Sequence, residues 1–269
     1  MSLLAPFEAF PVEHLAAGVI TEGKEYTLGD TDREFELASV TKLLATYGFL
    51  LACEEEVFTL DSPCGPATVR HLLAHASGVG FRSDDATRPA EQRRVYSSYG
   101  FELLAQQLEQ ETQMTFAEYL HEAVFVPLGM DATVLWGSPG HEARSTLSDM
   151  LRFAHELIDP QLLHPSTLEQ AFEVQFPTLD GVVPGYGMQK PCPWGLGFEI
   201  KGEKSPHWTG AEMPQDTVGH FGQSGTFLWL APKQRRAAVM LSDRDFGAWA
   251  KPLWQETNDA LWQSLQEGK

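Results

Sequence analysis

The sequence predicts an α+β fold in which strands from both ends of the chain form one antiparallel sheet flanked by helices. Two apolar stretches near the N-terminus, 15–21 and 26–30, are joined by a Glu-Gly-Lys turn, which is typical of a β-hairpin. Two apolar, β-branched stretches near the C-terminus, 226–230 and 236–242, predict a second hairpin. The region between them carries mainly helical patterns of apolar residues.

Composition and charge limit the classes of partner. The chain has 269 residues, of which 43% are hydrophobic, so there is room for one large domain or two interleaved ones around a sizeable core. The formal net charge of −18 repels phosphate backbones and anionic lipid head groups. We therefore expect neither a nucleic-acid nor a membrane partner. The sequence does not predict an oligomeric state.

Targeting signals and cysteine usage favour a cytoplasmic protein. No stretch approaches the roughly 20 apolar residues of a membrane span, and the first residues lack a basic region followed by an apolar run. The three cysteines, Cys53, Cys64 and Cys192, are odd in number and irregularly spaced. This pattern is typical of reduced thiols and predicts neither a disulfide framework nor a zinc site.

Helical periodicity defines the middle of the chain and its last segment. The expected order is strands, helices, strands and a final helix, with a strand at 195–200 and another approaching 225. We expect residues 1–59 and 191–269 to form an α/β domain with the antiparallel sheet, residues 60–190 to form an inserted helical domain, and an active site to lie between them. Helices are expected at about 39–55, 68–76, 100–111, 115–123, 145–158 and 248–265.

The start of the first expected helix carries a pair of residues with chemical meaning. Ser39 and Lys42 have the spacing Ser-x-x-Lys and precede an apolar run. Residues three apart on a helix share a face, so both side chains can reach one bound molecule. A serine hydroxyl needs a base to become a nucleophile, and a helix N-terminus offers N–H groups to an oxyanion. Alone, this spacing also fits an ordinary helix start.

Two further motifs turn this pair into a recognisable pattern. The motif around Ser39 is followed by a Tyr-Ser-Ser triplet and then by a His-Phe-Gly triplet, with a His-Leu-Leu-Ala-His-Ala-Ser-Gly segment and a Pro-Leu-Gly-Met segment between. From about residue 15 to 265 the chain resembles the serine β-lactamase and penicillin-binding-protein superfamily. Within it, the chain looks most like the branch of class C β-lactamases, D-alanyl-D-alanine carboxypeptidases and esterases. The motifs are Ser39-x-x-Lys42, Tyr96-Ser97-Ser98, His220-Phe221-Gly222, 71–78 and 127–130.

The resemblance implies a β-lactamase-like fold and a role for each motif. Ser39 matches the nucleophile that forms an acyl-enzyme, Lys42 matches the lysine beside it, and Tyr96 matches the tyrosine that shares in proton transfer. His220 and Gly222 match the ends of the motif on the strand that edges the site. The backbone N–H groups of Ser39 and Gln223 match the oxyanion hole.

A tyrosine base imposes a condition on pKa values. For Tyr96 to accept a proton near pH 7, its pKa has to fall from about 10 to about 7. We expect the Lys42 ammonium to lie at hydrogen-bond distance and to supply much of that shift. The pair then titrates as a unit.

Two residues depart from the usual motifs. Ser98 stands where the family usually has Asn, and a hydroxyl has a shorter reach than an amide, which weakens the binding of a substrate amide. His220 stands where many β-lactamases have Lys. With an ordinary pKa of about 6.5 it is mostly neutral at pH 7, so we expect it to bind a substrate carboxylate more weakly.

His71 and His75 have a spacing that would let both bind one metal ion on a helix face. They lie four apart, but the glutamate of His-Glu-x-x-His is missing and no third ligand is evident. We therefore expect structural roles for both, and neither a metal nor a cofactor.

These observations favour a serine hydrolase that uses a Ser39 acyl-enzyme on a small ester or amide substrate. Another serine-hydrolase type is disfavoured because Gly-x-Ser-x-Gly is absent. Carboxylesterase activity is favoured, because an acidic protein without a visible export signal does not meet peptidoglycan and because Ser98 and His220 weaken the case for β-lactams. The alternatives are a β-lactamase or D-alanyl-D-alanine carboxypeptidase, and a sensor that is acylated without turnover.

Overall fold

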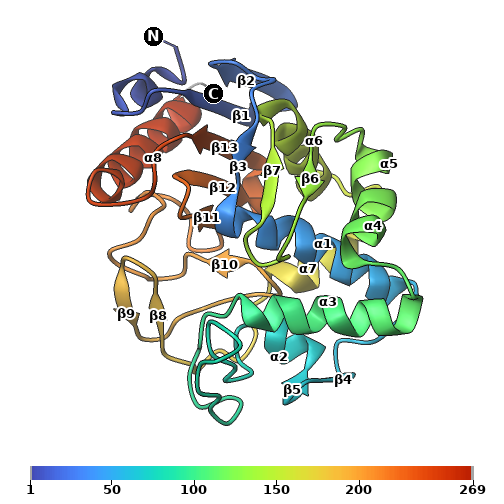
Figure 1. Cartoon of the computed structure of the whole chain (residues 1–269). Coiled ribbons are helices and arrows are strands. Elements are labelled where there is room, and N and C mark those ends of the chain that lie inside the picture. Colours follow the sequence, from blue (N-terminus) through green and yellow to red (C-terminus); the bar gives the residue numbers. More distant parts are fainter. Residues whose placement is uncertain (1, 268–269) are drawn as a thin grey trace.

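A six-stranded antiparallel sheet forms the middle of the molecule in the computed structural model, which describes residues 2–267 (Figure 1). The strand order is β10-β11-β12-β13-β1-β2, so the N-terminal hairpin pairs with the C-terminal strands through β1 and β13. This confirms the predicted sheet. The strands are β1 (Leu15–Thr21), β2 (Lys24–Leu28), β10 (Glu199–Ile200), β11 (Val218–Gly222), β12 (Thr226–Ala231) and β13 (Arg236–Ser242).

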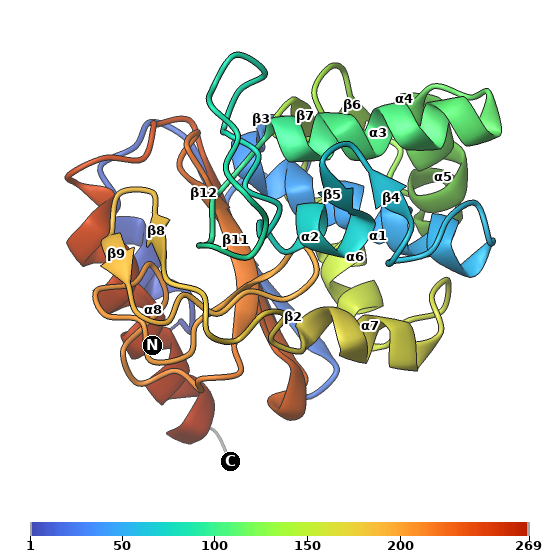
Figure 2. The same ribbon diagram turned by 90° about the horizontal axis from the view of Figure 1, so that it is seen from below.

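Helices cover both faces of this sheet. Figure 2 shows the strands between α8 on one side and the remaining helices on the other. Successive side chains of a strand point to opposite faces; accordingly Ala16 and Ile20 of β1 join the core under α1 and α6, whereas Ala17 and Val19 join the core under α8. The α-helices are α1 (Thr41–Glu54), α2 (Val69–Leu73), α3 (Tyr99–Thr112), α4 (Phe116–Leu120), α5 (Val126–Leu128), α6 (Leu147–Ile158), α7 (Pro165–Phe172) and α8 (Ala250–Glu267).

Short strands and turns connect these layers. The sequence did not predict them, because two or three residues carry too little periodicity. The helix expected from residue 145 begins at Leu147, since Ser145 ends a strand of the small sheet β3-β7-β6. The short strands are β3 (Phe35–Glu36), β4 (Pro63–Cys64), β5 (Ala67–Thr68), β6 (Val134–Leu135), β7 (Ala143–Ser145), β8 (Gly181–Val183) and β9 (Gly187–Gln189); short 3₁₀-turns span Ala5–Ala9, Ala38–Val40 and Pro232–Gln234, and a π-turn spans His121–Phe125.

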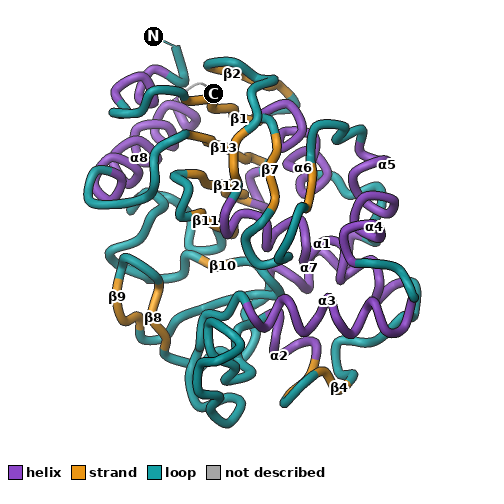
Figure 3. The backbone as a smooth tube through the Cα atoms, in the orientation of Figure 1, coloured by secondary structure: helices purple, strands orange, loops and turns teal. Residues whose placement is uncertain are grey.

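The strand expected at 195–200 is mostly wrong. Only β10 pairs with β11, and the preceding residues form an irregular segment within the loop-rich region beside β10 (Figure 3). Gly197 explains the difference: its φ of +73° lies in the left-handed region, and a Cβ there would clash with the Thr46 side chain of α1. The chain therefore turns against α1 before it enters the sheet.

Membrane insertion through a helix finds no support in the fold. Among residues 2–267, no helix combines the length and apolar character needed to cross a bilayer.

Trp254 is the aromatic anchor between α8 and the sheet. It is fully buried, and its ring lies 5.3 Å from that of Phe227 and 5.1 Å from that of Phe246. We expect Trp254→Ala to lower the free energy of unfolding by about 3–5 kcal/mol, because it leaves a cavity in this core. Urea unfolding measures the change. Trp136→Ala, at a side chain that is 52% exposed, is the matched control; an equal loss for both would contradict this role.

Candidate active site

Ser39 lies on the 3₁₀-turn Ala38–Val40, which leads directly into α1. It therefore precedes the α-helix that was expected to begin at residue 39. Ala38 has a φ of +44°, which is strained for a residue with a side chain. The turn is held against the sheet, because the Thr226 hydroxyl donates to the Leu37 carbonyl at 3.0 Å. A Cβ at Gly222 would clash with that same carbonyl, so this close approach requires glycine. Ser39 is thereby fixed beside the end of β11.

Lys42 lies one turn along α1 and has no exposed surface. Its ammonium nitrogen, Nζ, donates to the Gly140 carbonyl at 2.6 Å and to Ser98 Oγ at 3.0 Å, and lies 3.4 Å from Ser39 Oγ. Burial lowers the pKa of Lys42 to about 7, and the nearby charge of Glu102 offsets only part of that effect. Near neutral pH a large fraction of Lys42 is therefore the free amine, which is a proton acceptor.

Tyr96 completes the hydrogen-bonded group around the serine. Its hydroxyl donates to Ser39 Oγ at 2.7 Å, and its ring lies 4.7 Å from Lys42 Nζ. Burial raises the pKa of Tyr96, and the hydrogen bond to Ser39 does not reverse this. The expected fall of the Tyr96 pKa is therefore wrong: Lys42 faces the ring instead of the hydroxyl, and it loses its own charge through burial. Tyr96 is a proton donor here.

His220, on β11, presents a neutral imidazole to the site. Its Nδ1 lies 2.7 Å from the Phe221 carbonyl, which can only accept, so Nδ1 carries the proton. Nε2 is then an acceptor and lies 3.4 Å from the Tyr96 hydroxyl. Burial, followed by the charge of Lys42, lowers the pKa of His220 to about 4, so the ring is neutral at pH 7.

The other residues singled out by the motifs lie at the same place. Ser98 holds Lys42, as described above, and the turn after β11 contains Gln223. Among residues 2–267, no protein acceptor binds the backbone N–H of Gln223, which leaves this donor free. Gln223 and Ser39 also line the same two cavities. The fold thus brings together all seven candidate residues: Ser39, Lys42, Tyr96, Ser98, His220, Gly222 and Gln223.

The two histidines of α2 and the turn after it point to different partners. His71 pairs with Glu91 at 3.0 Å, and His75 is buried, with Nδ1 accepting the Ser97 N–H at 3.2 Å. The ring of His75 packs 4.8 Å from that of Tyr96, so it helps to hold the tyrosine. The only three potential metal ligands that converge within the described residues are Glu13, His14 and Asp243, at the surface and outside both cavities that contain Ser39.

Two cavities of contrasting character meet at Ser39. The smaller measures about 200 Å³ and has mainly aromatic walls. The larger measures about 770 Å³, is open and is lined mainly by residues with polar or charged side chains. The smaller is lined by Ser39, Phe81, Tyr96, Pro184, Trp194, Glu199, His220, Phe221 and Gln223; the larger is lined by Ala38, Ser39, Phe81, Arg82, Ser83, Asp84, Ser98, Glu102, His141 and Gln223.

Glu199 is a charged residue of the smaller cavity that the motifs did not indicate. It is buried and forms an ion pair with Lys204 at 3.1 Å; His207 lies at hydrogen-bond distance, and the indole of Trp208 donates to it at 2.8 Å. Burial raises its pKa, but Lys204 and these hydrogen bonds outweigh this and hold the pKa well below its usual range. The segment 201–217 therefore contributes to the site by neutralising this carboxylate. Sequence reasoning missed Glu199 because its place in this cavity depends on how distant segments pack together, which no local pattern indicates.

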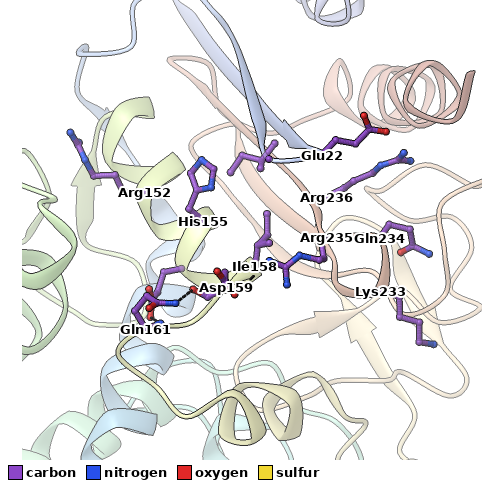
Figure 4. A pocket seen from close by; sticks show the side chains of 13 residues that line it. Glu22, Arg152, His155, Ile158, Asp159, Gln161, Lys233, Gln234, Arg235 and Arg236 are labelled. Atoms are coloured by element: carbon purple, nitrogen blue, oxygen red, sulfur yellow. Dashed lines mark hydrogen bonds and ion pairs between the residues drawn. The ribbon is translucent and has the colours of Figure 1, made fainter. Parts of the chain in front are cut away.

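A third cavity, of about 930 Å³, lies away from these residues, between the β1–β2 turn, α6 and the β12–β13 turn (Figure 4). Its walls are largely charged, and several of the charges already have partners: Arg235 pairs with Asp159, and Lys233 pairs with Asp216. It contains none of the candidate residues. Size alone therefore does not mark the reactive site.

Comparisons with known proteins agree with this geometry. The Beta-lactamase family model matches residues 12–259, so the chain belongs to the Beta-lactamase family. A crystal structure of a β-lactamase from Mycobacterium bovis is 48% identical, has a TM-score of 0.95, and is matched over 98% of this chain and 99% of its own. The β-lactamase-like α+β fold is thereby established.

Two more distant matches are a penicillin-binding protein and a hydrolase. Penicillin-binding protein 4* of Bacillus subtilis (strain 168) is 26% identical over 138 aligned positions, which cover 38% of this chain and 31% of that protein. The match therefore spans about a third of the relative's length. EstCE1, a hydrolase with promiscuous acyltransferase activity, is 15% identical with a TM-score of 0.78, and is matched over 96% of both chains. At that identity the likeness extends to the fold alone.

The buried amine gives a pH dependence. Below pH 7 Lys42 is protonated and cannot accept the serine proton; above pH 7 it is neutral, so kcat/KM for an ester is expected to rise with an apparent pKa near 7. A pH–rate profile measures this. Lys42→Arg, which stays charged, is expected to lose about 10²–10⁴-fold at every pH. A wild-type rate that is constant from about pH 5.5 to about pH 8.5 would argue against the assignment.

The Tyr96 hydroxyl is tested by removing one oxygen atom. Tyr96→Phe keeps the ring against His75 but removes the hydrogen bond to Ser39, so we expect turnover to fall by about 10²–10⁴-fold. Tyr119→Phe, which removes a hydroxyl bond to Glu55 elsewhere, is the control and should keep full activity. A fall smaller than about threefold in Tyr96→Phe would mean that Lys42 acts without the tyrosine.

Proposed function

We propose that this protein is a carboxylesterase that hydrolyses small esters through an acyl-enzyme on Ser39. The observation that carries the proposal is the hydrogen-bonded group of Ser39, Lys42 and Tyr96, in which the lysine has a pKa near 7. Membership of the Beta-lactamase family supports hydrolase chemistry in general. The proposed reaction uses these side chains and water, with a small molecule as its partner.

The acylation half of the reaction follows from the hydrogen bonds. Neutral Lys42 accepts the Ser39 proton as Oγ forms a bond to the ester carbonyl carbon. The carbonyl oxygen takes up negative charge, which the N–H groups of Ser39 and Gln223 stabilise. As the C–O bond to the alcohol breaks, Tyr96 donates its proton to the leaving oxygen and regains a proton from Lys42, either through Ser39 Oγ or through water.

Deacylation repeats these transfers with water. Lys42 is again neutral and accepts a proton from a water molecule whose oxygen bonds to the acyl carbon. The Ser39 oxygen leaves as the bond to the acyl group breaks and takes a proton from the Tyr96 hydroxyl, 2.7 Å away. Tyr96 then regains a proton from Lys42, through Ser39 Oγ or through water, which leaves both residues neutral. The products are the carboxylic acid and the starting enzyme, so atoms and charges balance over the cycle.

The electrostatics of the smaller cavity and of the residues beside Ser39 favour esters over β-lactams. A β-lactam and a peptidoglycan stem carry a carboxylate, which needs a cation near the nucleophile. His220 is neutral at pH 7, and Lys42 is buried and already bonded to the Gly140 carbonyl. The charged residue that lines the smaller cavity is Glu199, a carboxylate. A neutral ester meets no such penalty.

The nucleophile is tested directly with the Ser39→Ala variant. We expect it to abolish both release of p-nitrophenolate from p-nitrophenyl butyrate and mass labelling of the protein, while circular dichroism stays unchanged. Ser264→Ala, on the exposed face of α8, should keep both activities. Labelling that persists in Ser39→Ala would refute the assignment.

Burst kinetics separate the alternatives. Multiple turnovers of the ester, without a lasting adduct, support the esterase. A lasting adduct after one equivalent of product would favour an acyl-binding sensor, and faster turnover of a penicillin than of the ester would favour the β-lactamase named among the structural neighbours.

A further inference from the structure

The smaller cavity beside Ser39 has the character of an acyl site. Five of its lining residues, Phe81, Tyr96, Pro184, Trp194 and Phe221, are aromatic or apolar, whereas the larger cavity exposes Arg82, Asp84, Glu102 and other polar groups. An ester has two parts, and both must be placed when Ser39 attacks. The apolar cavity suits an apolar acyl chain, and the open polar groove suits the departing alcohol and the entering water.

The volume of the cavity limits the length of the chain. At about 200 Å³ it is smaller than the roughly 300–1,000 Å³ typical of pockets for drug-sized ligands. With about 30 Å³ for each water-sized group, it accommodates about six or seven non-hydrogen atoms. A butyryl group fits within that volume, and a decanoyl group exceeds it.

The electrostatics of the cavity also limit which acyl groups can bind. Glu199 holds a negative charge at the wall, and its oxygens are already occupied by Lys204, His207 and Trp208. An acyl group that ends in a carboxylate would lose its hydration in a mostly apolar space whose lining offers no unpaired cation, which is unfavourable. An ammonium group would find the carboxylate already paired. The cavity therefore favours uncharged chains.

Phe81 lies in a wall that the smaller cavity shares with its neighbours. Its ring lies 6.0 Å from that of Tyr96 in a stacked arrangement. Phe81 lines three cavities: the smaller cavity, the larger cavity, and a further one of about 400 Å³ that also contains Arg93 and Val182. Its backbone is fixed, because the Tyr99 N–H donates to the Phe81 carbonyl at 3.0 Å, while its side chain is 43% exposed. Removing this ring joins the spaces without disturbing the core.

We infer that this cavity binds the acyl part of the substrate and selects uncharged acyl groups of up to about six or seven non-hydrogen atoms, with Phe81 setting the limit. This inference rests on the proposed esterase function. It names the substrate class for the same site and a specificity-determining residue that no motif contains.

Acyl-length profiles test the size limit. The measurement is kcat/KM for p-nitrophenyl acetate, butyrate and decanoate. For the wild type we expect a fall of about tenfold or more from butyrate to decanoate. In Phe81→Ala the ratio of the decanoate value to the butyrate value should rise by about tenfold. Phe81→Leu should lie between the two. Tyr26→Ala, at an aromatic residue of β2 that is 41% exposed, is the matched control and should keep the wild-type profile.

Two esters with acyl groups of equal size test the charge. p-Nitrophenyl hydrogen succinate carries a free carboxylate, whereas p-nitrophenyl levulinate has a neutral methyl ketone in its place and the same number of non-hydrogen atoms in the acyl group. We expect the wild type to hydrolyse the levulinate at least about tenfold faster, which steric size cannot explain. This arm needs no variant of the protein, so it remains decisive whatever the folding of Phe81→Ala.

The outcomes separate the two proposals. A flat acyl-length profile, rates governed by the alkyl length of the alcohol, or equal rates for the hydrogen succinate and the levulinate would overturn the acyl-site inference while the esterase stands, provided that Ser39→Ala is inactive. A wild type that neither hydrolyses any of these esters nor becomes labelled on Ser39 would overturn the proposed function and this inference with it.

Discussion

The burial of one lysine amine beside a serine is the interaction on which the rest of the site depends. An ammonium ion without surrounding water is costly, so Lys42 gives up much of its proton affinity and reaches a pKa of about 7. The fold accommodates the amine by packing the backbone closely around it. Gly140 offers its carbonyl to Lys42 from a position where a Cβ would crowd Ser98. The burial that makes the charged form of Lys42 costly for folding also leaves the neutral amine able to act as a base.

Low net charge extends from this amine into the smaller cavity. His220 is neutral, and Glu199 is matched by Lys204. The chain as a whole carries a net charge of −18, yet the walls of the smaller cavity are mostly aromatic or neutral. Long-range repulsion of anions and the lack of an unpaired cation among the residues that line this cavity act in the same direction. Both favour a neutral substrate, and both follow from where the charges lie, not from the identity of the nucleophile.

The reactive residues could be predicted from the sequence because they lie in short motifs that resemble those of a known superfamily. Only the Ser39 and Lys42 pair also follows from local geometry, since the two residues lie one turn apart. The pKa values could not be predicted, because they depend on burial by segments far away in the chain. The walls of the smaller cavity could not be predicted either, because Phe81 and Trp194 belong to irregular segments without periodicity. The one strand placed wrongly, around Gly197, failed on a contact with Thr46 of α1.

A direct titration of the Lys42 amine tests the central claim. The protein labelled with ¹³C and ¹⁵N at lysine is titrated by NMR, and the Lys42 resonance is assigned by its loss in Lys42→Met. The account gives a Lys42 midpoint near 7, well below the ordinary lysine value of about 10.4. A Lys42 midpoint above about 9 would contradict it, because the amine would then be charged at neutral pH and the proton from Ser39 would need another acceptor.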